Sequence, residues 1–448
     1  MKKILSVLCV LTVAAALFTG CSKGGAKKGP VTVNLWSFTD EIPGMVDKYI
    51  ADHPDCGFTV NKTIIATTEG AYQPALDQAL MSGGAEAPDM YAAEAAFILK
   101  YSQGDMQQYA MPYKDLGIDI DAKIKAAEIA PYTVDIGSNT SGQVDALGYQ
   151  TTGGCFIYRR SIAKKVFGTD DPATIQSIIG GGSGNWTAFE AAAAKLAAAG
   201  VAIVSGDGDI WHAYENSSDK GWIVDGKLYI DPKREAFLDA SKQLTDKGWS
   251  NQTQDWTDAW FADMKDTGAK PCFGFFGPAW LINYVMAGNS GGSKVGEGTY
   301  GDWAVCNSPI GFFWGGTWVL ANKNMPAAKK NAVKTIIEWI TLDTSNDGLL
   351  YKWANGTLNG PNGTKDTVSS GVVLSKSNGN LDFLGGQNMF DYFVPANKYA
   401  NGKNLTQYDE TINSLWREQV RAYANGQKSR ADALKDFKQN VADKLGVE

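Results

Sequence analysis

The alternation of strand-like and helix-like segments near the start of the chain constrains its fold more than any other feature. A β-branched run at 31–36 is followed by an amphipathic segment at 41–55 and by a second strand-like run at 58–65. A helical segment at 72–84 and a third strand-like run at 87–94 continue the pattern. Strands that alternate with helices build parallel sheets, because each helix carries the chain back to the same end of the sheet. The sequence therefore predicts an α/β fold.

The length of the chain predicts more than one lobe. With 448 residues it is longer than a single hydrophobic core normally serves. After the first twenty residues, no stretch is long and apolar enough to cross a membrane. Two lobes outside the bilayer are therefore expected.

The first twenty residues have the pattern of an export signal. The basic start "MKK" precedes an apolar stretch at 4–17, and Gly20 stands directly before Cys21. This arrangement resembles a bacterial lipobox, with Phe18 where the usual Leu would be, and implies that Cys21 is lipidated. We expect a signal peptide at 1–20 and a lipidated flexible tether at 21–30, which would hold the protein on the cell membrane, facing the periplasm or the cell surface. The alternative is a plain secretory signal with an incidental cysteine.

The composition argues against two large classes of function. The net charge of −7 gives no basic surface for nucleic acid. The chain has only two histidines, His53 and His212, too few for a His-built metal site or a His-dependent catalytic triad. We expect no metal, no cofactor and no nucleic-acid partner.

The cysteines outside the signal and the lipobox leave their pairing open. Four remain, and four cysteines can pair in three ways. Three of them lie in apolar, strand-like runs, where buried free thiols are the ordinary expectation. The four are Cys56, Cys155, Cys272 and Cys306.

An apolar strand-like run at 272–276 ends in an unusual way. It is followed by Gly277, Pro278 and Ala279, and then by Trp280, after which the sequence becomes helical. Trp280 thus stands where a strand passes into a helix, which is a frequent position for a ligand-contacting residue in α/β folds.

Several motifs, taken in order, resemble one protein family. They are "ALMSGGAEAPDMY", "GCFIYRRS", "NWTAFE", "PCFGFFGPAW", "NSPIGFFWGGTWVLAN" and "AVKTIIEWI". The chain resembles the extracellular solute-binding proteins of bacterial ABC importers, of the carbohydrate-binding type (family 1) to which the maltose-binding proteins belong. Two departures are Arg159 and Arg160, where the family often has Asn-Lys, and a glycine-rich loop before Trp186.

The resemblance implies a fold and its division. The expected fold is the two-lobed α/β periplasmic-binding-protein fold, class II-like, with a ligand cleft between lobes joined by three crossing segments. These crossings are expected near 146–151, 308–311 and 357–362. The lobes would then comprise 31–147 plus 311–358, and 148–310 plus 359–448.

The resemblance also implies a function. The chain would be the substrate-binding component of an ABC transporter, a monomer without enzymatic activity that captures a sugar or oligosaccharide. Its lobes would close on the ligand like a Venus flytrap, and its partners would be the permease subunits in the membrane.

Sugar chemistry and the resemblance together suggest the ligand contacts. Flat aromatic rings cover the apolar faces of a sugar, while carboxylates and amides bond its hydroxyls. The resemblance implies that Trp211, Trp280 and Trp314 stack on the sugar and that Gly315 permits a close approach to the backbone. It implies hydroxyl contacts for Asp40, Glu41 and Glu94, and for Gln387 and Tyr392, which would close the site. The set is Trp36, Asp40, Glu41, Glu94, Trp211, Trp280, Trp314, Gly315, Gln387 and Tyr392.

Other roles stay open for some of these residues. Asp40 could only cap the helix that follows it. Trp256 and Trp260 are spaced as on one helix face, for which core packing is the first interpretation. As a whole, the chain could instead be a secreted lipoprotein glycosidase or lyase that uses a carboxylate pair among Asp40, Glu69 and Glu94. A third reading is an adhesin-like surface lipoprotein.

Overall fold

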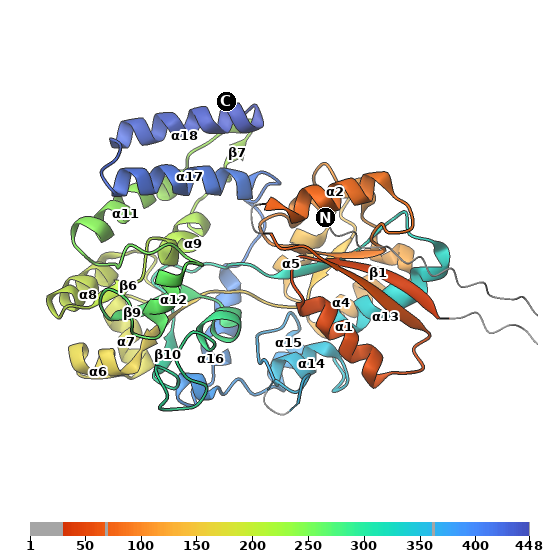
Figure 1. Cartoon of the computed structure of the whole chain (residues 1–448), viewed down its shortest axis with the longest axis horizontal. Helices are drawn as coiled ribbons and strands as arrows, with labels where there is room; N and C mark the ends of the chain where they lie inside the picture. Colours follow the sequence, from red (N-terminus) through yellow and green to blue (C-terminus); the bar gives the residue numbers. More distant parts are fainter. Residues whose placement is uncertain (1–29, 68–69, 361–362, 448) are drawn as a thin grey trace, which may run out of the picture.

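The structure is a computed structural model that describes residues 30–67, 70–360 and 363–447. Cys21, the signal peptide and nearly all of the tether lie outside these residues. Two separate sheets, each covered by helices, form two lobes that lie side by side in Figure 1. The first lobe, on the right, contains the start of the described chain, and the second, on the left, contains its end.

The sheet of the first lobe has five strands. Parallel pairing joins β1 to β2 and to β3, as the alternating pattern predicts, but β11 runs antiparallel between β3 and β4. This direction follows from the topology, because β11 enters the sheet directly from the second lobe and not through a helical crossover. The order is β2 (Phe58–Ile64), β1 (Val31–Ser37), β3 (Met90–Glu94), β11 (Thr317–Ala321) and β4 (Ala146–Gly148).

Amphipathic helices cover this sheet. In α1 the buried residues include Ile42, Met45 and Val46, whose spacing of three and four residues places them on one face of the helix. The helices of this lobe are α1 (Glu41–Asp52), α2 (Tyr72–Ser82), α3 (Ile98–Ser102), α4 (Ile120–Ala127), α5 (Pro131–Gly137), α13 (Lys330–Thr341), α14 (Leu349–Ala354) and α15 (Gly371–Ser375).

The sheet of the second lobe has four strands. Its order is β10 (Trp303–Cys306), β5 (Cys155–Arg159), β9 (Cys272–Gly277) and β6 (Ala202–Val204). All residues of β5 and β9 are buried, because helices cover both faces. The helices of this lobe are α6 (Arg160–Phe167), α7 (Pro172–Ile179), α8 (Thr187–Ala198), α9 (Gly208–Asn216), α10 (Pro232–Glu235), α11 (Phe237–Asp246), α12 (Asp258–Met264), α16 (Phe390–Ala396), α17 (Asp409–Ala424) and α18 (Arg430–Leu445). A small hairpin is formed by β7 (Ile223–Val224) and β8 (Lys227–Leu228).

Three stretches of chain lie against one another where the lobes meet. The first connects β4 to β5, and its Thr152 hydroxyl donates to the Gly315 carbonyl at 2.8 Å, in the stretch that connects β10 to β11. Thr367, from the third, donates its hydroxyl to the Thr151 carbonyl at 2.6 Å. The lobes are therefore joined along a compact bundle of backbone.

The third stretch leaves the first lobe at a later residue than the sequence suggests. The Ser370 hydroxyl donates to the Ala127 carbonyl at 2.6 Å, and α15 packs against α4. The chain contacts the second sheet at Phe383, whose ring lies parallel to that of Trp303 with the centroids 6.0 Å apart. We therefore propose that the third crossing lies between residues 376 and 382, later than the expected 357–362, and that residues 363–375 belong to the first lobe.

One more segment, residues 397–408, contacts both lobes. The chain enters and leaves this segment in the second lobe. Asn404 donates to the Ser218 carbonyl of the second lobe at 3.0 Å. In the first lobe, the Gln407 side chain accepts from the Asp105 amide at 3.0 Å, and Leu405 packs against a core cluster. We refer to residues 397–408 as the bridging loop.

Candidate functional site

Trp280 lies at the boundary between the lobes, and its ring is only partly buried. It follows Gly277, Pro278 and Ala279 at the end of β9 and precedes a π-helical turn, η4 (Leu281–Met286). Its indole N–H donates to the Trp314 carbonyl at 2.9 Å, and the two rings are close to perpendicular, with centroids 4.7 Å apart. The turn after β9 thus brings this ring out of the core of the second lobe.

Trp314 is held by a histidine. The ring of His212 stacks on that of Trp314 at 4.6 Å with an angle of 24° between the planes. The Nδ1 atom of His212 lies 2.8 Å from a Glu215 carboxylate oxygen, and Glu215 also accepts from Asn413. These contacts fix the orientation of Trp314, with His212 in a packing role.

Trp256 completes an aromatic wall, by which we mean Trp256, Trp280 and Trp314. Its ring is parallel to that of Trp280 within 8°, at a centroid distance of 6.2 Å, and 48% of the residue is exposed. The helix spacing predicted for Trp256 and Trp260 is wrong for Trp256, because Thr257 caps α12 and Trp256 stands before the helix. Trp260 is a core residue as expected, 1% exposed, and its indole N–H donates to Asp209.

Glu94 approaches the aromatic wall from the first lobe. It ends β3, and one carboxylate oxygen accepts from the Ala96 amide at 2.8 Å. Burial raises the pKa of Glu94 to about 7, with a further contribution from the negative charges of Glu410 and Glu215. A carboxylate that is costly to ionise here gains from any ligand hydroxyl that donates to it.

Gly315 lies between Glu94 and Trp280. Its φ of +74° is in the left-handed region. A Cβ at this position would lie 3.3 Å from Trp280 Nε1 and 3.4 Å from a Glu94 carboxylate oxygen. The glycine therefore lets the crossing segment pass between a carboxylate of one lobe and an indole of the other.

Asp40 and Glu41 are two further residues of the first lobe at the boundary between the lobes. Asp40 is exposed, and its side chain makes no capping hydrogen bond to α1, so the capping role is not observed. Glu41 accepts from the Tyr149 hydroxyl, and burial together with the charges of Asp366 and Asp40 raises the pKa of Glu41 to about 8. From the second lobe, Tyr284 is 58% exposed, and burial together with the charges of Glu41 and Asp40 raises its pKa.

Trp36 lies in β1, next to the core of the first lobe. Its ring is partly buried against a cluster that includes Tyr72, and its indole N–H is buried without a hydrogen-bond partner in the described residues. The position keeps one polar atom unsatisfied, which is uncommon for a buried indole.

Two predicted contacts require correction, and a third, that of Tyr392, stays a prediction. Trp211 is 1% exposed and packs on Phe237, so no face of its ring is open to a ligand; on α9 it is the next residue, His212, that reaches the aromatic wall. The side-chain amide of Gln387 bonds the backbone N–H and C=O of Val305 at 2.9 and 2.8 Å, and so extends the edge of β10. Tyr392 is partly buried against both core clusters, and its contact with a ligand stays a prediction.

The thiols and acids of the described ranges give no metal centre. Residues 30–67, 70–360 and 363–447 contain no group of three His, Cys, Asp or Glu side chains that could hold a metal ion. Cys56, Cys155, Cys272 and Cys306 are all free, and only Cys56 is partly exposed. No helix of this described portion could span a bilayer.

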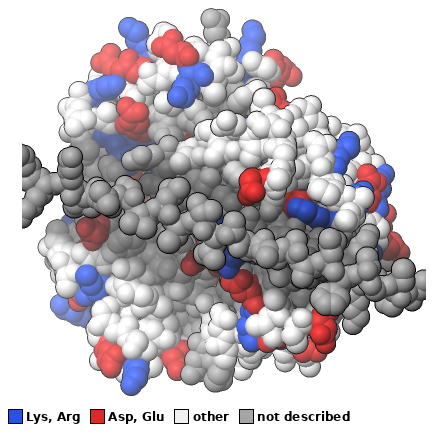
Figure 2. Space-filling model, turned by 45° about the vertical axis from the view of Figure 1, so that its right-hand side comes forward, with Lys and Arg blue, Asp and Glu red and all other residues white. Residues whose placement is uncertain are grey.

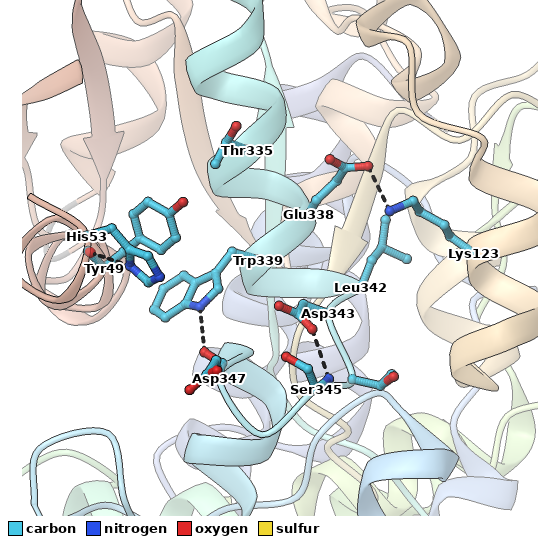
Figure 3. Close-up of a pocket in the computed structure, with 11 residues that line it drawn as sticks. Tyr49, His53, Lys123, Thr335, Glu338, Trp339, Leu342, Asp343, Ser345 and Asp347 are labelled. Atoms are coloured by element: carbon cyan, nitrogen blue, oxygen red, sulfur yellow. Dashed lines mark hydrogen bonds and ion pairs between the residues drawn. The ribbon is translucent and has the colours of Figure 1, made fainter. Parts of the chain in front are cut away.

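A separate cavity of about 600 Å³ lies on the first lobe, between α1 and α13 (Figure 3). Its aromatic residues contact each other: Tyr49 stacks on His53 at 4.2 Å and meets Trp339 edge-on at 5.0 Å. Trp339 is only 5% exposed.

The visible surface carries mixed charge. Figure 2 shows Lys and Arg side chains interspersed with Asp and Glu side chains on the part of the face that is not covered in grey. No extended basic patch lies in that view, in agreement with the net charge of −7.

Comparison with known proteins shows the fold. No family model and no curated protein sequence matches the chain. An extracellular solute-binding protein of family 1 superposes with a TM-score of 0.71 at 18% identity, over 93% of this chain and 99% of the other. The galacto-N-biose/lacto-N-biose I-binding protein of an ABC transporter from Bifidobacterium longum, in complex with lacto-N-biose, gives 0.66 at 18% identity over 94% and 98%. The sugar-binding protein MalE from Xanthomonas citri gives 0.65 at 14% identity over 93% and 98%. The two-lobed solute-binding-protein fold predicted from the sequence is confirmed.

Proposed function

We propose that this chain is the lipid-anchored substrate-binding component of an ABC transporter and that it captures a sugar or oligosaccharide between its lobes. The observation that carries the proposal is the meeting of the aromatic wall with Glu94 across Gly315. Indole faces suit the apolar faces of a sugar ring, and a desolvated carboxylate suits its hydroxyls. The sugar-binding transporter proteins that share the fold support the same function.

The ligand contacts that we propose come from both lobes. Trp280 and Trp314 would stack on the sugar, and Gly315 would let it approach the backbone. Glu94 would accept from sugar hydroxyls, and Asp40, Glu41 and Trp36 would line the first-lobe side. A ligand that touches both sides stabilises the closed arrangement by its differential affinity for it.

An enzyme is the second candidate. A glycosidase or lyase would need a carboxylate pair, and the raised pKa of Glu94 is compatible with a general acid. The sugar-binding neighbours and the lack of a recognisable catalytic motif favour the binding function. The partners that we propose are permease subunits in the cell membrane, which the protein would meet on the outer side as a monomer.

The first prediction concerns the anchor. Cys21→Ala should yield a protein without an acyl chain, because the lipobox cysteine is the expected site of modification. Mass spectrometry of the protein isolated from membranes measures this directly. An unmodified Cys21 in the wild type would contradict the lipid anchor.

The second prediction concerns binding and closure. A panel of glucose, galactose, maltose, β-1,6-galactobiose, lacto-N-biose and longer oligosaccharides should contain a ligand that raises the unfolding temperature, because a ligand of the native state stabilises it. The same ligand should reduce the radius of gyration in solution scattering and be recovered intact after incubation. Hydrolysed sugar would favour the enzyme, and the absence of any stabilising sugar would contradict the proposed function.

A further inference from the structure

Tyr284 is a large aromatic residue that the second lobe leaves exposed at its boundary with the first. It is 58% exposed, whereas the other apolar residues of the turn η4 are buried, namely Leu281, Ile282, Val285 and Met286. A π-helical turn such as η4 is rare and is frequent at functional sites. Tyr284 follows Trp280 by about one helical turn, so the same segment presents both residues at the boundary.

The first lobe lies directly beside this turn. The side-chain amide of Asn283 donates to the carbonyl of Lys365, in the stretch that we assign to the first lobe. Burial and then the charge of the next residue, Asp366, raise the pKa of Glu41, which is the first residue of α1. Tyr284 therefore projects from the second lobe at a point where that lobe contacts the first, close to the start of α1.

Asp40 offers a free carboxylate at the start of α1. It is exposed and makes no capping hydrogen bond, whereas Glu41 already accepts from the Tyr149 hydroxyl. Burial and then the charges of Glu41 and Asp40 raise the pKa of Tyr284, so both carboxylates act on its hydroxyl across the boundary. A protonated phenol donates a hydrogen bond, and an ionised carboxylate accepts it. The two lobes thus carry an exposed donor and an exposed acceptor at one boundary.

We infer that Tyr284 and Asp40 form a latch between the lobes: when the lobes close on a ligand, the Tyr284 hydroxyl donates to the Asp40 carboxylate. The inference rests on the proposed function and concerns the closed arrangement. A hydrogen bond that forms only on closure stabilises the closed state over the open one, and this difference adds to the affinity for the ligand. Tyr284 is thus a positioning residue, which acts on the lobes and not on the sugar.

The first variant is Tyr284→Phe, studied with the full-length protein. It removes the hydroxyl and keeps the ring, so affinity for the best sugar of the panel should fall about 5- to 20-fold. The loss should appear in the dissociation rate, because the latch forms after the ligand has entered. The free protein should keep its unfolding midpoint, because Tyr284 is exposed. Titration calorimetry gives the affinity, and stopped-flow tryptophan fluorescence gives the rates.

A double-mutant cycle with Asp40→Ala decides whether the two residues act on each other. In the Asp40→Ala background, Tyr284→Phe should lower affinity less than about 2-fold, because the acceptor is already gone. The matched control is Tyr399→Phe. Tyr399 is also an exposed tyrosine, 38% exposed, but it lies in the bridging loop, and loss of its hydroxyl should leave sugar affinity unchanged.

Two results would overturn the latch. One is an equal loss of affinity from Tyr284→Phe with and without Asp40, since the hydroxyl would then act on the sugar or on another group. The other is unchanged affinity of Tyr284→Phe in the wild-type background. Both results leave the proposed sugar binding intact, whereas a wild type that binds no sugar of the panel removes the proposed function and this inference with it.

Discussion

Trp280→Ala is expected to weaken sugar binding about 30- to 150-fold. A stacked indole face removes on the order of 100 Å² of apolar surface from water, which is roughly 2–3 kcal/mol at about 25 cal/mol per Å². The free protein should lose much less stability, because the ring is already partly open to solvent. Titration calorimetry gives the affinity, and denaturant unfolding without ligand gives the stability.

Trp211→Ala is the matched control for this variant. Trp211 is the same residue type in the same lobe, but it is 1% exposed and packed on Phe237. Truncating a buried tryptophan leaves a cavity and typically costs about 3–5 kcal/mol of folding stability. If Trp280→Ala showed this behaviour, with near-normal sugar affinity, the stacking role of Trp280 would be wrong.

Glu94→Gln is expected to change both affinity and the pH dependence of stability. The amide keeps the shape of the side chain and removes the charge. Charge-assisted hydrogen bonds contribute about 1.5–3 kcal/mol, so sugar affinity at pH 8 should fall about 10- to 150-fold.

Stability should change in the opposite direction. The folded protein raises the pKa of Glu94 from 4.5 to about 7, so the folded state holds its proton more tightly than the unfolded state does. The stability that this proton gives is fully present below pH 4.5 and is lost as the pH rises through about 7. At pH 8 the wild type carries a charge at this partly buried site and Glu94→Gln does not, so the variant should be more stable by on the order of 1–3 kcal/mol.

Denaturant unfolding at pH 5 and pH 8 measures this difference, which should shrink at the lower pH. Glu86→Gln is the control, because Glu86 is an exposed glutamate of the same lobe and should change neither quantity. A stability gain that is the same at both pH values would show that burial of the charge is not its cause. Unchanged affinity would remove Glu94 from the ligand contacts.

Local patterns predicted the fold because they depend on neighbouring residues. The alternation of strands and helices up to Glu94 needs only periodicity, and the turn after β9 needs only Gly277 and Pro278. The position of Trp280 at the boundary of the lobes follows directly from that turn. Periodicity does not predict the direction of a strand. Strand β11 is antiparallel because the chain enters it from the other lobe.

The misplaced residues depend on contacts between distant parts of the chain. Consecutive residues of an α-helix point about 100° apart, so the choice between Trp211 and His212 depends on how α9 packs. The Gln387 side chain is hydrogen-bonded to the backbone of Val305 at the free edge of β10, 82 residues away in the chain. Trp256 was assigned to a helix face by its spacing from Trp260, whereas the cap at Thr257 signals that the helix begins later.

The crossing segments and the bridging loop have a consequence for gene architecture. Each lobe is assembled from separate stretches of the polypeptide, and strand β11 of the first sheet is encoded downstream of the whole second sheet. The last two helices supply Trp416 and Phe437 to the core of the second lobe. No single cut in the coding sequence therefore releases either lobe as an intact unit, so that a half-length fragment would lack part of a sheet or of a core.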